Sequence, residues 1–270
     1  MSPSPALVDA PSGRRSRFRS IGLLLGALAL ALVSVGTTAC GPASDSTSSL
    51  TISAASSLQG AFTDLRTQFE ASHPQVAVTI NFGASSTLAQ QIIAGAPVDV
   101  LASADEANMS KVRDANLLAG DPTVFATNTL EIIVGRGNPS KISTLADLTR
   151  PGTIYVTCAP NVPIGRYSEQ IFAKAGLTST PASLEPDVKG IVTKVISGEA
   201  DAGIVYATDV AATEGAADGI EIPVDANVVA IYPIAPIAGS PNGGAAQAWI
   251  DFVMGPDGRS ILEAHGFGAP

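Results

Sequence analysis

Serine, small residues and proline gather at four places where an apolar, strand-like run meets a tight turn and then an amphipathic helix. The stretches are TISAASSLQGAF from Thr51, TINFGASSTLAQQI from Thr79, YVTCAPNVPIGRYSEQIF from Tyr155 and EPDVKGIVTKVI from Glu185. In the last of them the strand lies further upstream or is missing. A helix start leaves about four backbone N–H groups unpartnered and carries the positive end of the helix dipole. Several converging starts would form an oxyanion receptor that needs no lysine or arginine.

The elements that must position these helix starts alternate along the chain as strand and helix. Such alternation predicts an α/β fold with mainly parallel sheets. We expect two lobes joined by two crossing segments, near residues 126–129 and 227–230. Lobe 1 would contain residues 50–127 and 229–270, and lobe 2 residues 128–228. The sequence does not decide which lobe carries the C-terminal helix.

The first 39 residues have the composition of an export signal. A basic run ends at Arg19, an apolar run covers residues 21–35, and small residues precede Cys40. The apolar run is too short for a comfortable membrane span. The segment resembles a bacterial lipoprotein signal, in which residues 1–39 are removed and Cys40 is acylated. The protein would then be lipid-anchored to the cell membrane on its extracytoplasmic side. A plain secretory signal with an incidental cysteine is the alternative.

Composition limits the classes of partner. Residues 40–49 are rich in serine and threonine and are expected to form a flexible tether. Removing residues 1–39 takes away four of the 15 basic and one of the 24 acidic residues, which leaves 11 against 23 and a net charge of −12. This acidity argues against a nucleic-acid partner. It also argues against an anion site built on long-range attraction, so local backbone dipoles would have to hold an anion.

Five short motifs resemble, in order, those of the periplasmic molybdate-binding proteins of ABC importers, which have a type II periplasmic-binding-protein fold. They are AASSL from Ala54, GASSTLA from Gly83, APVDV from Ala96, VPIG from Val162 and GIVY from Gly203. The resemblance extends from about residue 50 to the C-terminus. It implies an extracytoplasmic receptor that captures molybdate, and also tungstate, for an ABC permease in the membrane. We expect the receptor to be a monomer with a hinge between its lobes.

Carried over by position, the resemblance implies five ligand-binding residues. Ser57 and Ser85 would each give a hydroxyl and a backbone N–H, Ile164 and Val188 a backbone N–H only, and Tyr206 its phenolic hydroxyl. A fully ionised tetrahedral oxyanion has acceptors and no donors, so a cage of donors suits it. Molybdenum or tungsten would enter only within the oxyanion, without a direct protein ligand, and no cofactor is expected.

Other ligands meet this cage differently. Sulfate, which is also fully ionised, is the main alternative ligand, and only the size of the cavity can reject it. Phosphate near neutral pH keeps a proton, which an all-donor site leaves unpaired at about 1–3 kcal/mol.

Each site residue also has an ordinary structural interpretation. Ser57 and Ser85 could be helix caps, and Tyr206 a core aromatic residue. Asp187 is expected to cap the helix that follows it, which would keep its carboxylate away from an oxyanion. Cys158 is expected to be a small buried hydrophobe. With Cys40 acylated it is the one remaining cysteine, so no intrachain disulfide can form.

Enzyme and metal-binding motifs are missing from the sequence. It contains no G-x-S-x-G elbow, H-E-x-x-H or P-loop, and its two histidines, His73 and His265, stand in no recognisable motif with a serine. We therefore expect no enzyme, with a serine hydrolase and a structural surface lipoprotein as remote alternatives. Clusters of ligands for a free metal cation are also lacking.

Overall fold

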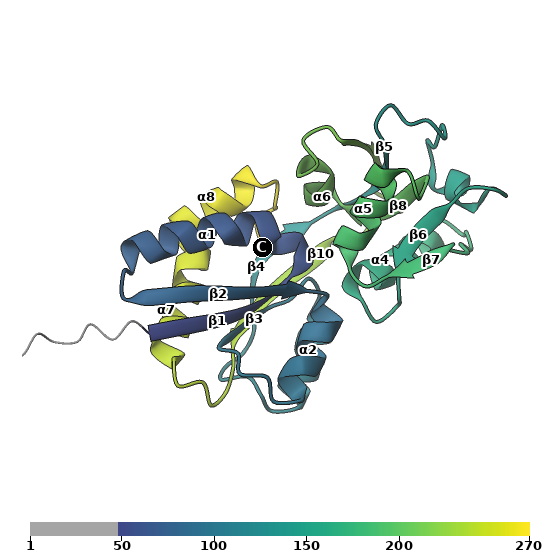
Figure 1. Cartoon of the computed structure of the whole chain (residues 1–270). Helices are drawn as coiled ribbons and strands as arrows, with labels where there is room; N and C mark the ends of the chain where they lie inside the picture. Colours follow the sequence, from purple (N-terminus) through teal and green to yellow (C-terminus); the bar gives the residue numbers. More distant parts are fainter. Residues whose placement is uncertain (1–47) are drawn as a thin grey trace, which may run out of the picture. The chain divides into compact units, whose positions relative to one another are not determined.

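The structure is a computed structural model, and it describes residues 48–270. The predicted signal, Cys40 and most of the predicted tether lie outside the described residues. Figure 1 shows two lobes in the described range, each built around a five-stranded sheet. Within that range, each helix is too short or too polar to cross a membrane.

The first sheet has the strand order β2-β1-β3-β10-β4. Its strands are β1 (Ser48–Ala55), β2 (Val76–Gly83), β3 (Val100–Ala102), β4 (Thr123–Asn128) and β10 (Ala230–Pro236). β1 is parallel to both β2 and β3, whereas β10 is antiparallel to β3 and β4. The carboxyl ends of β1, β2 and β3 therefore share one edge, from which the following helices start.

The second sheet has the strand order β7-β6-β8-β5-β9. Its strands are β5 (Leu130–Gly135), β6 (Tyr155–Cys158), β7 (Ser183–Glu185), β8 (Ala202–Tyr206) and β9 (Ala217–Glu221). β6 is parallel to β7 and β8, and β5 is antiparallel to β8 and β9. The chain passes between the sheets after β4 and again after β9.

The α/β class is confirmed, but both sheets are mixed, whereas the alternation of elements predicts mainly parallel ones. The antiparallel pairings all involve β10 in the first sheet and β5 in the second. These are the strands by which the chain enters each sheet from the other. Leu130, at the start of β5, lies opposite Tyr206 at the carboxyl end of β8. An entering strand thus begins where the parallel strands end, and it must run in the opposite direction.

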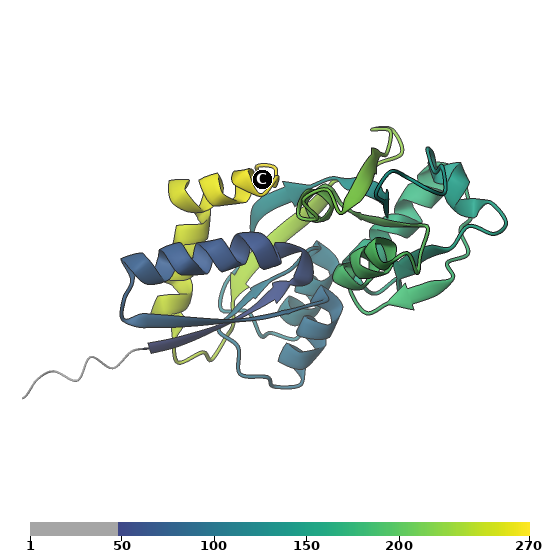
Figure 2. The same ribbon diagram turned by 45° about the horizontal axis from the view of Figure 1, so that its top comes forward.

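The helices of the first lobe cover both faces of its sheet. They are the short 3-10 helix η1 (Ser56–Leu58), which continues into α1 (Gln59–Ser72), and α2 (Ser85–Ile93), α3 (Glu106–Asp114), α7 (Gly243–Met254) and α8 (Pro256–Ala264). Figures 1 and 2 both show α8 beside α1. The ring of Trp249 packs edge-on against Phe62 and Phe69 at centroid distances of 5.7 and 5.2 Å. The C-terminal helices therefore belong to the first lobe, which the sequence leaves open.

The second lobe contains η2 (Leu145–Thr149), α4 (Pro163–Lys174), α5 (Val188–Ser197) and α6 (Ala207–Ala211). Helix α5 lies so close to the sheet that a Cβ atom on Gly203 would be 2.2 Å from the Cγ2 atom of Ile191. Glycine at this position of β8 allows that approach. The packing holds the start of α5 at the carboxyl edge of the sheet.

Strand β1 begins at Ser48 and so includes the last two residues of the polar tether that the composition predicts. The N–H of Ser48 donates to the carbonyl oxygen of Gln75 at 2.8 Å, and Ser48 pairs with Val76. Backbone hydrogen bonds of a parallel pair do not depend on the side chain, so a polar residue can extend the strand. The tether prediction is therefore wrong for Ser48 and Ser49.

Candidate functional site

A small cavity lies between residues from the carboxyl edges of the two sheets. About 10 Å³ inside it is free for the centre of a water-sized sphere. A single water molecule needs about 10–15 Å³ by the same measure, so the cavity is about the size of one water. A larger ligand would therefore need the lobes to move apart. The structure brings all five residues suggested by the sequence to its wall: Ser57, Ser85, Ile164, Val188 and Tyr206.

Ser85 is the first residue of α2, but its side chain does not cap that helix. The residue before the helix is Ala84, and no side-chain cap is present there. The Ser85 Oγ instead accepts a hydrogen bond from the backbone N–H of Ala104 at 2.9 Å. Since an Oγ that accepts in this way keeps its own proton for another partner, Ser85 can donate into the cavity. Its backbone N–H also precedes the first hydrogen bond of the helix, which runs from Leu88 to Ala84.

Ser57 lies in η1, directly after β1, and it does not cap the helix either. Ala55 precedes η1 without a side-chain cap. The Oγ of Ser57 is 3.0 Å from the hydroxyl oxygen of Tyr232, and the pair is buried. The capping interpretation is therefore wrong for both serines, whose hydroxyls are held by other groups at the cavity.

Ile164 brings the start of α4 to the cavity through its backbone. The first helical hydrogen bond runs from the N–H of Arg166 to the carbonyl oxygen of Val162 at 3.0 Å. The N–H of Ile164 precedes that bond, and Pro163 has no N–H to compete with it. The Ile164 side chain is buried in the core. What this residue offers a ligand is consequently a main-chain donor.

Val188 offers the corresponding donor at the start of α5, and the expected role of Asp187 is confirmed. The Oδ1 of Asp187 accepts hydrogen bonds from the N–H groups of Lys189 at 2.9 Å and Gly190 at 3.2 Å. This leaves the N–H of Val188 outside the cap. Asp187 also lines the cavity, but these two hydrogen bonds engage its carboxylate.

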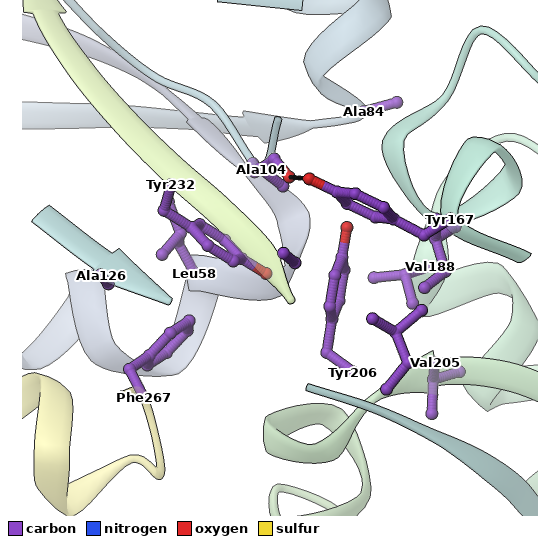
Figure 3. Close-up of a cluster of buried hydrophobic side chains, with 14 of the residues drawn as sticks. Leu58, Ala84, Ala104, Ala126, Tyr167, Val188, Val205, Tyr206, Tyr232 and Phe267 are labelled. Carbon is purple, nitrogen blue, oxygen red and sulfur yellow. Dashed lines mark hydrogen bonds between the residues drawn. The ribbon is translucent and has the colours of Figure 1, made fainter. Parts of the chain in front are cut away.

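Tyr206 ends β8, and its hydroxyl is the most informative group of the cavity. Its side chain is buried, and within residues 48–270 the hydroxyl has no hydrogen-bond partner. Burial raises the pKa of this phenol well above its ordinary value, so it keeps its proton. Figure 3 shows the hydroxyl pointing to the side on which Ala104 and Tyr167 lie. An unpartnered buried hydroxyl costs about 1–3 kcal/mol. A ligand that accepts a hydrogen bond would remove this cost.

The cavity has donors but no basic side chain. None of its described lining residues is lysine, arginine or histidine, so neutral hydroxyls and main-chain N–H groups supply the positive potential. Within the described range no three His, Cys, Asp or Glu residues are grouped so as to hold a metal ion. A small anion is therefore the ligand that the arrangement favours.

Several polar contacts join the lobes near the cavity. The hydroxyl of Tyr167 donates to the carbonyl oxygen of Ala104 at 3.2 Å, as Figure 3 shows. The Nδ2 of Asn108 donates to the carbonyl oxygen of Asn161 at 3.2 Å. The Nη1 of Arg166 lies 3.4 Å from the Oδ2 of the buried Asp105, which caps α3. The lobes are thus in contact across the site.

Sequence reasoning missed Tyr167 and Tyr232, which contact the cavity wall without being among its predicted residues. Tyr167 follows the VPIG motif on a helix whose aromatic residues look like core. Tyr232 lies in a strand, 175 residues from Ser57. Neither position carries a local signal, because its partner is distant in the chain.

The histidines lie away from the cavity. The Nε2 of His265 is 2.8 Å from the Oδ2 of Asp64, and His73 ends α1. Neither lines the cavity, so Ser57 and Ser85 have no imidazole base beside them. Cys158 is buried, as expected of a small hydrophobe.

Comparisons with known proteins agree with this architecture. Residues 50–268 match the model of the family described as bacterial extracellular solute-binding protein. The molybdate-binding protein ModA of Mycobacterium tuberculosis is 42% identical over 261 residues, which cover 93% of this chain and 100% of the relative.

Two solved structures share the fold but differ in ligand. The sulfate-binding protein SubI from Mycobacterium tuberculosis aligns with a TM-score of 0.73 and 20% identity, covering 82% of this chain and 86% of its own. The periplasmic molybdate-binding protein from Azotobacter vinelandii aligns with a TM-score of 0.72 and 22% identity, covering 82% and 99%. At such identities they show the fold alone. The family match and the 42% identical relative carry the assignment: the chain belongs to the bacterial extracellular solute-binding proteins, in the family of the molybdate-binding protein ModA.

Proposed function

We propose that this protein is an extracytoplasmic receptor that binds molybdate, and also tungstate, between its lobes and delivers it to an ABC permease in the membrane. The observation that carries the proposal is the Tyr206 hydroxyl, which is buried in the cavity without a partner among residues 48–270. A ligand that only accepts hydrogen bonds would satisfy it.

The other cavity groups support the same ligand class. The hydroxyl proton of Ser85 is free to be donated. The N–H groups of Ile164 and Val188 lie in the first turns of α4 and α5, before the first hydrogen bond within each helix. These groups, with Ser57 and Tyr206, would surround a tetrahedral oxyanion with donors. Charge-assisted hydrogen bonds of this kind are the strong ones, so such a site can be tight without a basic residue. The metal atom of the anion would touch no protein atom.

The choice of molybdate rests on the relative. A protein named for molybdate binding is 42% identical over its whole length, whereas the sulfate-binding neighbour shares only the fold. Sulfate remains the second candidate because it too is a fully ionised tetrahedral anion. Its bonds are shorter than those of molybdate, and cavity size must exclude it. Molybdate and tungstate are nearly equal in size, so one cavity should accept both.

Isothermal titration calorimetry tests the ligand. The protein without its first 39 residues, carrying Cys40→Ser, would be titrated with molybdate, tungstate, sulfate and phosphate at neutral pH. Residues 48–270 contain both sheets and their cores, so this form keeps the whole described fold. We expect tight binding of molybdate and tungstate, much weaker binding of sulfate and none of phosphate. Tight sulfate binding without molybdate binding would make the protein a sulfate receptor.

The anchor is a separate part of the proposal. Cys40, which lies outside the described residues, would carry the acyl chains, with residues 1–39 removed as the signal. Cys40→Ser should release the protein from the membrane fraction of the expressing bacterium, whereas the parent should pellet with membranes. Recovery of the variant in the membrane pellet would rule out this anchor.

The protein would act by binding rather than by catalysis, and as a monomer. One chain supplies every group proposed for the cage, and no histidine is among the described residues that line the cavity with the serines. Size-exclusion chromatography with light scattering, with and without molybdate, should give the mass of one chain in both conditions.

A further inference from the structure

Tyr232 is a buried residue of β10 that does not line the cavity, yet its hydroxyl reaches a group that does. The distance from its hydroxyl oxygen to the Oγ of Ser57 is 3.0 Å, and the Tyr232 side chain has no exposed surface. Distance alone does not tell which hydroxyl donates.

The burial of Tyr232 decides the direction of this hydrogen bond. If Ser57 donated, the phenolic proton of Tyr232 would need an acceptor of its own. The Asn128 side chain lies nearby, but its amide group lowers the pKa of Tyr232 as a hydrogen-bond donor does, and its Oδ1 accepts from the N–H of Thr129 at 2.9 Å. Within residues 48–270 the hydroxyl has no hydrogen bond to an acceptor other than Ser57. Burial has the larger effect and raises the pKa of Tyr232 well above its ordinary value, so the phenol keeps its proton at neutral pH. The arrangement that satisfies both groups has Tyr232 donating to Ser57, which leaves the Ser57 proton for the cavity.

The second serine of the cavity is held in the same way. The backbone N–H of Ala104 donates to the Oγ of Ser85 at 2.9 Å, so Ser85 also has its proton free. The hydroxyl oxygen of each serine thus accepts a hydrogen bond from a neighbouring donor. At Ser85 this donor belongs to the main chain, but at Ser57 it is a side chain that can be changed.

We propose that Tyr232 is a positioning residue that orients Ser57 as a hydrogen-bond donor and thereby disfavours anions that carry a proton. A serine hydroxyl that is free to turn can accept as well as donate, so it could receive the proton of hydrogen phosphate. When Tyr232 donates to it, Ser57 has one lone pair engaged and its proton turned toward the cavity, which favours a ligand atom that accepts. This inference rests on the proposed oxyanion function and adds to it a residue outside the cavity wall.

A double-mutant cycle tests whether Tyr232 acts through Ser57. The variants are Tyr232→Phe, Ser57→Ala and the double variant, and calorimetry with molybdate gives the affinity of each. Tyr232→Phe keeps the ring, and it should weaken binding about 3- to 10-fold in the parent, as expected for loss of one oriented hydrogen bond. In the Ser57→Ala background the same change should weaken binding less than about twofold, since the hydroxyl through which it acts is gone. An equal loss in both backgrounds would overturn the inference and leave Tyr232 as a packing residue.

Tyr155→Phe is the matched control. Tyr155 is a buried tyrosine of the second lobe whose hydroxyl also lacks a partner in the described range, and it does not line the cavity. The Tyr155→Phe variant should bind molybdate with the same affinity as the parent. Circular-dichroism melting of all variants checks that they are folded.

Competition with phosphate tests the exclusion itself. At pH 7 the ratio of phosphate affinity to molybdate affinity should rise about tenfold in Tyr232→Phe, because Ser57 can then accept a proton. An unchanged ratio would overturn the claim that Tyr232 sets specificity. A parent that fails to bind molybdate would instead refute the proposed function, so the two failures are distinguishable.

Discussion

The hydroxyl of Tyr167 donates to the carbonyl oxygen of Ala104 at 3.2 Å, and this hydrogen bond joins the second lobe to the first. The N–H of the same Ala104 donates to the Oγ of Ser85 at 2.9 Å. One residue therefore holds a cavity hydroxyl on one side and receives an interlobe contact on the other. Closure of the lobes and the orientation of Ser85 are linked through Ala104.

Tyr167→Phe should weaken molybdate binding by about 2- to 10-fold, because it removes the hydroxyl that donates to Ala104 and also accepts from the N–H of Ile231 at 3.4 Å. The phenylalanine ring keeps the edge-on contact with Tyr206, whose centroid lies 6.5 Å away. The hydrogen bonds of this hydroxyl join the two lobes. Without them the dissociation rate of molybdate should rise, while its association rate stays nearly constant. Stopped-flow displacement of bound molybdate measures both rates. Unchanged affinity and dissociation would show that this contact does not stabilise the closed form.

Gly165→Ala should damage both folding and binding. A Cβ atom there would lie 2.2 Å from the carbonyl oxygen of Ala159 and 2.5 Å from that of Cys158, so the start of α4 must move. We expect a loss of about 1–3 kcal/mol in the free energy of unfolding, measured in urea. Molybdate binding should weaken as well, because the N–H of Ile164 moves with the helix.

Gly244→Ala is the control for that change. An added Cβ atom meets nothing within 4 Å at this exposed position of α7. Alanine inside a helix is more favourable than glycine by about 0.5–1 kcal/mol, so this variant should be as stable as the parent or slightly more so. If the two alanine variants behave alike, the close approach at Gly165 does not constrain the site.

The buried thiol of Cys158 should make the free energy of unfolding fall at alkaline pH. Burial, with smaller effects from the charges of Asp187 and Glu185, raises the pKa of its thiol far above the ordinary value. In the unfolded chain the thiol has its ordinary pKa of about 8.5. A pKa that is raised on folding contributes stability that is complete below the unfolded pKa and is lost as pH rises above it.

The measurement for Cys158 compares urea unfolding of the parent and of Cys158→Ala at pH 8 and pH 10. Between pH 8 and pH 10 the free energy of unfolding of the parent should fall by about 2 kcal/mol more than that of the variant. This difference is the cost of keeping the thiol protonated in the folded protein. The buried tyrosines are common to both proteins and cancel in the difference. Identical losses would mean that the Cys158 thiol ionises in the folded protein.

The strand–turn–helix units were predictable because apolar periodicity and the turn residues are local signals. Those signals also placed Asp187 as a helix cap, which the hydrogen bonds from Lys189 and Gly190 confirm. The direction of β5 and β10 was not predictable in this way. It depends on the edge at which each strand enters its sheet, and that is a property of the whole topology.

The site shows the same division between local and distant information. Motifs pointed to Ser57 and Tyr206, and the structure brings both to one cavity. The motifs also suggested that Ser57 could be a helix cap, because a serine at a helix start usually caps it. The actual partner of Ser57 is Tyr232, from a strand 175 residues away. No spacing rule connects such a pair.

Tyr206→Phe tests the proposed site most directly, because it removes a fully buried cavity hydroxyl that lacks a partner in the described structure and changes almost no volume. The ligand-free variant should melt at the same temperature as the parent or higher, since an unsatisfied buried group is gone. A hydrogen bond to a charged group contributes about 1.5–3 kcal/mol, so the affinity for molybdate measured by calorimetry should fall roughly 10- to 150-fold. Molybdate binding as tight as that of the parent would contradict the account, because Tyr206 would then be a core aromatic residue and the anion would lie elsewhere.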